Sequence, residues 1–315
     1  MDLSLKIDTI DGINEQELFR EYFQRQKPVI IKGLLDGTEA GRLWSIEYMK
    51  QKLGHVTVEV YDNTLPKITA YTHGDLTMPF HEFADHITRP EKARYRLFLF
   101  DGFKHDESLR KEFPCPGIFK GLLGKIGFMF FGGVDTHVRM HYDIDMSNVL
   151  HTQFTGRKRI LLFAPEYNDL LYKTPFNTFS IADFANPDYD KFPGLKYVKG
   201  YDITLEHGDS LFMPSGYWHY MMYQEGGFAV AYRKMAHSII YKLQGLGNLT
   251  YRLWIDKLMS VLLGKRWLNY KMKLAHRRAD KAITDWELRE YGLIEHDELP
   301  EPEIQHNSEP LPHAA

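Results

Sequence analysis

The chain contains a single cysteine, Cys115, so it cannot form an internal disulfide. It has no run of eighteen uncharged apolar residues, which predicts that no segment spans a membrane. A strong net charge is also missing: the formal value is −3 at pH 7, which gives no overall attraction to nucleic acid or to anionic lipid. No signal-peptide pattern opens the chain, and no internal repeat is evident. These absences together predict a cytoplasmic protein.

Apolar and aromatic residues are plentiful. Hydrophobic residues make up 43% of the 315 positions, and aromatic residues make up 14%. Such a chain can bury a large core, which excludes disorder over most of its length. The length suits one large domain with an extension, or two domains.

Short strands between frequent turns dominate the middle of the chain, from Phe128 to Lys234. Turn signals stand at Gly132-Gly133, Gly156, Gly208-Asp209 and Gly226-Gly227. A long insertion, residues 167–200, is rich in Pro, Asn and Tyr. Many short strands separated in this way favour a β-sandwich or a barrel that closes on itself.

The N-terminal part mixes helices and strands. A helix is predicted after Asn14, which with Glu17 forms a capping-box pattern. The other predicted elements are strands over 29–31, 55–61 and 95–100, helices over 44–53 and 78–87, and a loop over 103–127.

The character of the sequence changes after Ser238, where leucines recur at helical spacing. Ten basic residues lie between Lys242 and Lys281 against two acids, whereas the last stretch is acidic and rich in proline. We therefore predict three parts: a β domain with its N-terminal elements over 1–236, a helical extension over 237–292, and a disordered acidic tail over 293–315.

Two histidines and one aspartate form a candidate metal site. His141 and Asp143 are two residues apart, so on a strand both side chains point the same way. His219 follows a predicted strand and a Pro-Ser-Gly turn, and it can reach the same point from elsewhere in a barrel. Two histidines and one carboxylate bind non-haem Fe(II) and leave coordination positions open. His-x-Asp pairs also occur by chance, and on a helix His137 and His141 would instead form a zinc-type pair.

Lys158 lies among aliphatic residues of a predicted strand. By parity it shares a face with Asn148, Leu150, Thr152 and Phe154, while Arg157 and Arg159 point outward. A buried ammonium group is costly unless an anion meets it, and the C5 carboxylate of 2-oxoglutarate is such an anion. We therefore place Thr152 beside Lys158 among the cosubstrate contacts. The alternative is a lysine that extends from the barrel rim into water.

Several motifs, taken in order, resemble the cupin-like JmjC oxygenases, and among them the asparaginyl hydroxylases. They are QKPVIIKG, GRKRILLF, NPDYDKFPG and GDSLFMPSGYWHY, within a region from about Leu18 to Lys234. The resemblance implies a mainly β fold, the double-stranded β-helix or jelly roll, with N-terminal α/β elements and a C-terminal helical extension. It also implies an enzyme that uses Fe(II) and 2-oxoglutarate to hydroxylate a carbon–hydrogen bond.

The resemblance assigns roles to individual residues. His141 and His219 match the iron histidines, and Lys158 matches the lysine that binds the cosubstrate carboxylate. Asn148 matches an asparagine beside the cosubstrate, and Tyr95 matches a tyrosine that helps to hold it.

The sequence also departs from the family pattern. Counting back from Gly156 without a gap places Asp145 on the family's iron aspartate, whereas strand geometry favours Asp143. Arg233 stands where an asparagine is expected near the metal. It either contacts a bound substrate or cosubstrate or pairs with a nearby carboxylate.

A protein side chain is the first predicted substrate, because the asparaginyl hydroxylases act on proteins. A tRNA base is the main alternative, since a family member hydroxylates a modified guanosine and the region 242–281 is basic. A small molecule also suits a cupin cavity. A barrel that only binds or dimerises is the competing class of function, and the helices after Ser238 suit a homodimer.

Overall fold

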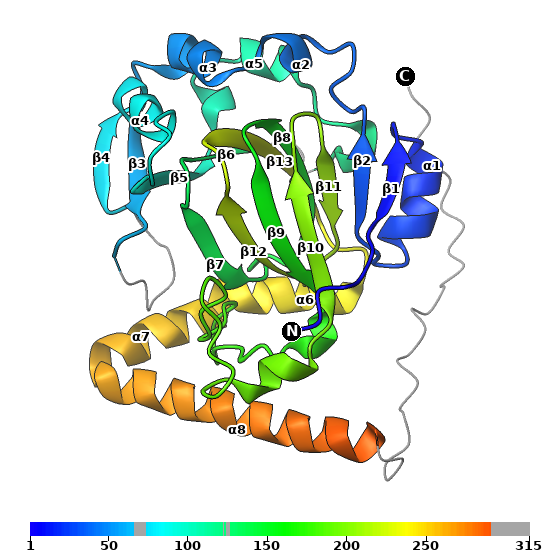
Figure 1. Cartoon of the computed structure of the whole chain (residues 1–315), viewed down its shortest axis with the longest axis vertical. Helices are drawn as coiled ribbons and strands as arrows, with labels where there is room; N and C mark the ends of the chain where they lie inside the picture. The colour runs from blue at the N-terminus through cyan, green and yellow to red at the C-terminus, as the bar shows by residue number, and fades with distance from the viewer. Residues whose placement is uncertain (66–73, 122, 124–126, 291–315) are drawn as a thin grey trace.

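The computed structural model of the protein describes residues 1–65, 74–121, 123 and 127–290. Two β-sheets face each other at its centre, with helices above and below them (Figure 1). Within the described residues the larger sheet has nine strands in the order β1-β2-β11-β8-β13-β6-β5-β3-β4, and the smaller has four in the order β10-β9-β12-β7. All pairs are antiparallel except β1 with β2. This arrangement confirms the predicted mainly β jelly roll.

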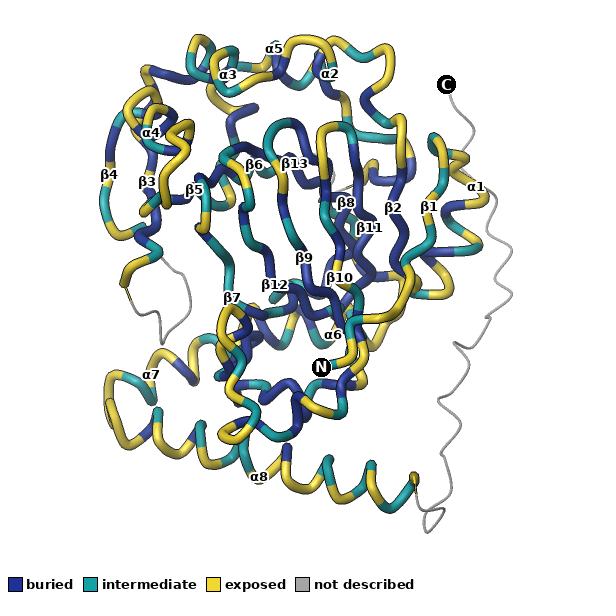
Figure 2. The backbone as a smooth tube through the Cα atoms, in the orientation of Figure 1, coloured by how far each residue is buried: buried dark blue, intermediate teal, exposed yellow. Residues whose placement is uncertain are grey.

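The strands are short and mostly buried. Those of the larger sheet are β1 (Asp8–Asp11), β2 (Val29–Lys32), β3 (Thr57–Asp62), β4 (Leu76–Pro79), β5 (Tyr95–Phe100), β6 (Gly127–Gly132), β8 (Asn148–Thr155), β11 (Ser210–Met213) and β13 (Gly227–Lys234). Those of the smaller sheet are β7 (His137–His141), β9 (Lys158–Phe163), β10 (Gly200–Leu205) and β12 (Trp218–Tyr223). Buried positions run along the central strands of both sheets (Figure 2).

Three apolar clusters hold the layers together. One lies between the two sheets and includes Val149 of β8 and Ile160 of β9. A second joins the outer face of the larger sheet to the N-terminal helices, with Trp44 packed against Phe154. A third joins the outer face of the smaller sheet to the 167–197 insertion and to the last helix. The barrel is therefore covered on both outer faces.

The N-terminal helices largely follow the predicted pattern. The Asn14 side chain accepts hydrogen bonds from the backbone N–H groups of Gln16 and Glu17, both at 3.2 Å, so the predicted cap is present. The helical elements before β6 are α1 (Glu15–Glu17), η1 (Leu18–Phe23), α2 (Glu39–Leu43), α3 (Ile46–Leu53), α4 (Phe80–Ile87), η2 (Gly102–Lys104), α5 (Ser108–Glu112) and η3 (Gly117–Phe119).

Several predicted elements differ from the structure. The helix predicted over 44–53 begins at Ile46, because Trp44 ends α2 and Ser45 caps α3. The helix predicted over 78–87 begins only at Phe80, because Pro79 is extended and ends strand β4. The predicted loop over 103–127 contains α5, which was not foreseen from the sequence.

The C-terminal extension forms helices beneath the smaller sheet (Figure 1). They are α6 (Ile239–Gly247), the π-helical turn η7 (Asn248–Arg252), α7 (Leu253–Leu263) and α8 (Lys265–Glu290). In the described part of the chain, no helix is both long and apolar enough to cross a membrane. The acidic tail predicted over 293–315 lies outside the described residues.

Candidate functional site

The predicted metal residues converge on one point of the smaller sheet. His141 ends β7 and pairs directly with His219 on the neighbouring strand β12. Asp143 follows β7 by two residues. One ligand atom from each of the three side chains lies within 4.8 Å of the others. The two histidines thus come from hydrogen-bonded neighbours, where the sequence suggested only that they meet inside a barrel.

Hydrogen bonds fix how the two imidazoles can bind a metal. Nδ1 of His141 lies 2.9 Å from the carbonyl oxygen of Arg139, and Nδ1 of His219 lies 3.1 Å from that of Tyr217. A carbonyl only accepts, so each Nδ1 carries the proton and each Nε2 keeps a free lone pair. This is the tautomer that a metal ligand requires, and the sequence did not reveal these partners.

Burial keeps both imidazoles neutral. It lowers the pKa of His141 well below the usual value, with a further decrease from His219, whose ring centroid is 4.2 Å away. Burial also lowers the pKa of His219, although Asp143 partly opposes it. Two neutral imidazoles beside one carboxylate fit a divalent cation, and this donor set with open positions suits Fe(II).

Arg233 distinguishes the two candidate aspartates. One of its nitrogens donates to Asp143 Oδ1 at 2.8 Å, and the other donates to both oxygens of Asp145 at 3.0 Å. Asp145 Oδ1 also accepts from the backbone and side chain of Ser147. Asp143 therefore keeps one oxygen for an ion, whereas both Asp145 oxygens are occupied.

The charge of Arg233 is held in place by these contacts. Burial alone would lower the pKa of Arg233, but the carboxylates of Asp143 and Asp145 outweigh burial and raise it. The sequence left two roles open for Arg233, a contact with a bound ligand and a pair with a nearby carboxylate. In the structure Arg233 contacts the carboxylates of Asp143 and Asp145, in the loop after β7.

Lys158 is buried in the barrel, with only 1% of its surface exposed. Its Nζ lies 3.0 Å from Nε2 of His151 and 4.4 Å from the centre of the Tyr223 ring. Among the described residues, no carboxylate forms an ion pair with it. Burial lowers the pKa of Lys158 to about 7. An anion that entered the barrel would favour its charged form.

The predicted parity around Lys158 was wrong. Leu150 and Phe154 point outward into the N-terminal cluster, whereas Val149 belongs to the cluster between the sheets. The chain crosses from one sheet to the other between β8 and β9, so the alternation does not continue through Gly156. His151, seven residues before Lys158, is therefore its actual neighbour, and the sequence analysis missed it.

Two other predicted cosubstrate contacts lie on the same outward face, and a third lies on another strand. Asn148 and Thr152 share the outward parity, and they bind Ser215 and Ser210 at 3.0 and 2.9 Å. Tyr95, on β5, packs against the N-terminal cluster. The structure thus brings Lys158 together with none of these three residues.

The zinc-type pair of His137 and His141 requires a helix, and both residues lie on strand β7. His137 instead contacts Asn63, whose side-chain nitrogen is 3.0 Å from the His137 carbonyl oxygen. The helical alternative is therefore wrong.

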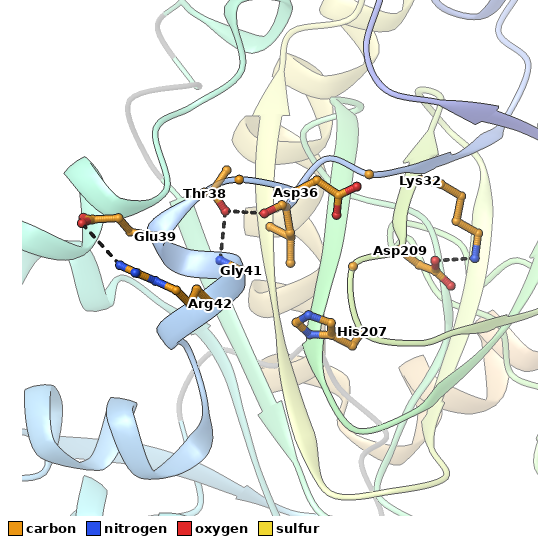
Figure 3. Close-up of a pocket in the computed structure, with 12 residues that line it drawn as sticks. Lys32, Asp36, Thr38, Glu39, Gly41, Arg42, His207 and Asp209 are labelled. Atoms are coloured by element: carbon orange, nitrogen blue, oxygen red, sulfur yellow. Dashed lines mark hydrogen bonds and ion pairs between the residues drawn. The ribbon is translucent and has the colours of Figure 1, made fainter.

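Two pockets flank the barrel without being lined by the three metal residues. The larger, of ≈ 690 Å³, lies between the 32–42 loop and the 207–209 turn, where Lys32 pairs with Asp209 and Thr38 caps α2 (Figure 3). The second, of ≈ 560 Å³, is lined by Arg139 of β7, Phe179 of the insertion and Lys271 of α8. Arg139 and Phe179 lie next to His141. The ring nitrogen Nδ1 of His141 is hydrogen-bonded to the Arg139 carbonyl oxygen, and Phe179 forms an isolated β-bridge with His141. The second pocket therefore adjoins the metal residues.

Comparison with known proteins gives a consistent family. The profile of the cupin-like domain matches residues 15–233. The chain is 26% identical to tRNA wybutosine-synthesizing protein 5 of Gallus gallus over 246 residues, which cover 72% of this chain and 76% of that protein. It is 34% identical to HSPB1-associated protein 1 of Homo sapiens over 223 residues, 62% of this chain and 45% of that protein. It is 27% identical to lysine-specific demethylase 8 of Xenopus tropicalis over 229 residues, 69% of this chain and 50% of that protein.

Replacing Lys158 with Met should stabilise the metal-free protein, because it removes a buried charge that has no acidic partner. We expect the free energy of unfolding near pH 7 to rise by on the order of 1–4 kcal/mol. In the native chain, Lys158 has a pKa of about 7 against 10.5 for an ordinary lysine. Between these two pKa values, the unfolded chain binds more protons at Lys158 than the native state does. The free energy of unfolding of the native protein therefore rises with pH, and the extra stability of Lys158→Met becomes smaller.

Urea denaturation at pH 7 and pH 9 measures this difference. Lys196→Met, at an exposed position, is the matched control and should leave stability unchanged. A Lys158→Met protein that is less stable than the native one at pH 7 would show that the lysine is already well compensated.

Proposed function

Because the chain belongs to the cupin-like domain family, we propose that it is an Fe(II)- and 2-oxoglutarate-dependent oxygenase that hydroxylates a carbon–hydrogen bond. One observation carries the proposal: two imidazoles and a carboxylate gather in the same barrel as a buried lysine for which the described residues offer no carboxylate partner. The cluster suits the metal, and the lysine suits the far carboxylate of the cosubstrate.

The register of the strands supports a shared site. On β9, Lys158 pairs with Tyr223, and Leu162 pairs with His219. Four residues of strand, about 13 Å, therefore separate the backbone of the lysine from that of the iron ligand. An extended lysine side chain and a five-carbon dicarboxylate together bridge a distance of this order. The ammonium group would bind the C5 carboxylate, while the C1 carboxylate and the keto oxygen would face the metal residues.

Each residue then has a defined task. Bound Fe(II) would supply the oxygen activation that converts 2-oxoglutarate into succinate and CO2 while oxidising the substrate. His141 and His219 would offer Nε2, and Asp143 would offer its free oxygen. Lys158 would orient the cosubstrate, and the imidazole of His151 beside it would accept a hydrogen bond from the ammonium group. The apolar barrel wall would exclude water from the reacting atoms.

A barrel that only binds or dimerises is the competing function. Such a barrel has no need for two imidazoles and a carboxylate at one point, nor for a buried lysine that lacks a carboxylate partner among the described residues. Both features cost stability unless a ligand uses them, so their presence favours an enzyme.

Two substrate classes have support. The similarity to tRNA wybutosine-synthesizing protein 5 favours a tRNA nucleotide, and the basic residues of α8 suit a phosphate backbone. The names HSPB1-associated protein 1 and lysine-specific demethylase 8 point instead toward protein partners. A small molecule would need neither the basic helix nor a macromolecular surface.

A second copy of the chain is the proposed partner of α6 and α7. Both helices contain exposed positions (Figure 2), and many of the exposed residues are apolar. The most exposed are Ile239, Ile240, Leu243, Leu246, Trp254, Leu258, Val261 and Leu262, each at 58–79%. Contiguous apolar surface of this kind marks an interaction site.

Anaerobic titration with Fe(II) and 2-oxoglutarate tests the activity class. The chelate gives a weak visible charge-transfer band, and we expect the native protein to develop it. Asp143→Asn should abolish the band because it removes a ligand, whereas the matched Asp145→Asn should retain it. A native protein without the band would refute the proposal, and loss of the band only in Asp145→Asn would reassign the ligand.

Binding to tRNA discriminates between the substrate classes. Lys273, Arg277 and Lys281 are exposed and lie at helical spacing on α8. Their joint replacement by Gln should weaken tRNA binding. It should also reduce the slope of log K against log salt concentration by about 0.9 for each phosphate contact that is lost. Replacement of Arg20, Arg25 and Arg42 removes the same charge elsewhere and should change neither quantity. Equal binding by both variants would remove α8 as the tRNA contact.

Sedimentation equilibrium tests the homodimer. Native protein should sediment as a dimer, and the variant Trp254→Glu with Leu258→Glu should sediment as a monomer because it places charge in the apolar surface. The control variant Leu5→Glu changes a residue that is 41% exposed and lies near the N-terminus, outside α6 and α7. It should remain dimeric. A monomeric native protein would contradict the assignment.

A further inference from the structure

The loop that carries Asp143 is not held by its own turn alone. Residues 142–147 join β7 to β8, and the N–H of Met146 donates to the Asp143 carbonyl at 3.0 Å. Met146 has a φ of 54°, in the left-handed region that a side chain disfavours. Such a conformation persists when surrounding contacts enforce it. The contacts that hold this loop therefore determine where the Asp143 carboxylate lies.

One of these contacts is a close backbone approach from helix α6. Gly245 is buried against the loop, and a Cβ atom at this position would lie 2.4 Å from the carbonyl oxygen of Asp145. The obstacle is backbone and not the end of a flexible side chain. Any larger residue at position 245 must therefore displace the helix or the loop.

The second contact comes from the next turn of the same segment. Asn248 is buried, and its side-chain nitrogen donates to the carbonyl oxygen of Ile144 at 3.1 Å. Its side-chain oxygen accepts from Arg252 at 2.9 Å, which fixes the orientation of the amide. Asn248 begins the π-helical turn η7, and such irregular turns are frequent at functional sites.

The loop is thus held from two sides. Arg233 of β13 binds Asp143 and Asp145 from the barrel, while Gly245 and Asn248 hold the intervening backbone from the C-terminal helices. The family profile ends at residue 233, so Gly245 and Asn248, which hold the loop from the second side, lie outside the matched domain.

We infer that Gly245 and Asn248 are positioning residues for the Asp143 ligand, so that the C-terminal helices complete the metal centre from outside the barrel. This inference rests on the proposed function, because it takes Asp143 as a metal ligand. The outer face of α6 remains available to a partner, since the contacts with the loop use the inner face.

Mn(II) binding followed by electron paramagnetic resonance tests the inference without turnover. Gly245→Ala should weaken Mn(II) binding by about 10- to 100-fold, as loss of outer-shell support does in other metal sites. Gly247→Ala is the matched control, because a Cβ there meets only the exposed side chain of Tyr251, at 3.0 Å. It should bind Mn(II) as the native protein does.

Asn248→Ala provides a second variant that does not force two backbones apart. It should also weaken Mn(II) binding, whereas Thr250→Ala, in the same turn but exposed, should not. If Gly245→Ala fails to fold, the Asn248 pair decides the question. Native affinity in Asn248→Ala, or in a folded Gly245→Ala, would overturn the inference.

Hydrogen exchange in the metal-free protein separates this inference from the proposed function. Amides of the 142–147 loop should exchange about tenfold faster in Gly245→Ala and Asn248→Ala than in their controls. Absence of Mn(II) binding by the native protein would refute the proposed function. Unchanged exchange in both variants would instead refute the role of Gly245 and Asn248 in holding the loop, whatever the affinity for Mn(II).

Discussion

The direct pairing of His141 with His219 across β7 and β12 is the constraint on which the site depends. It brings two buried rings to a centroid distance of 4.2 Å, and burial keeps both of them neutral. Carbonyl groups take the Nδ1 protons, so two lone pairs converge beside the Asp143 carboxylate. This arrangement is poorly satisfied by protein atoms alone, and a divalent cation satisfies it.

The remaining polar groups of the barrel follow from the same logic. Lys158 is buried and pairs with no carboxylate in the described part of the chain, and Asp143 and Asp145 share Arg233. Buried charges without a full complement of opposite charge cost stability, and the proposed cation and dicarboxylate would offset that cost. The apolar clusters on both outer faces provide the stability that such a site requires.

The jelly roll and the grouping of His141, Asp143 and His219 were predictable from the sequence because their signals are local. His141 and Asp143 share one strand end, and His219 belongs to a distinctive motif. The role of Arg233 remained open, because its carboxylate contacts join residues about 90 positions apart. His151 was missed because parity was continued through the turn at Gly156, where the chain changes sheets. The support from Gly245 and Asn248 had no sequence signal, since it depends on where a separate helix packs.

We propose that His141, Asp143, His219 and Lys158 form a single site for a metal and a dicarboxylate. The most direct test is a crystal structure of the protein grown without oxygen in the presence of Mn(II) and 2-oxoglutarate. The account predicts one ion bound by the two imidazoles and the Asp143 carboxylate, with the C5 carboxylate of the cosubstrate on Lys158. An ion bound elsewhere, or a dicarboxylate that does not reach Lys158, would contradict it.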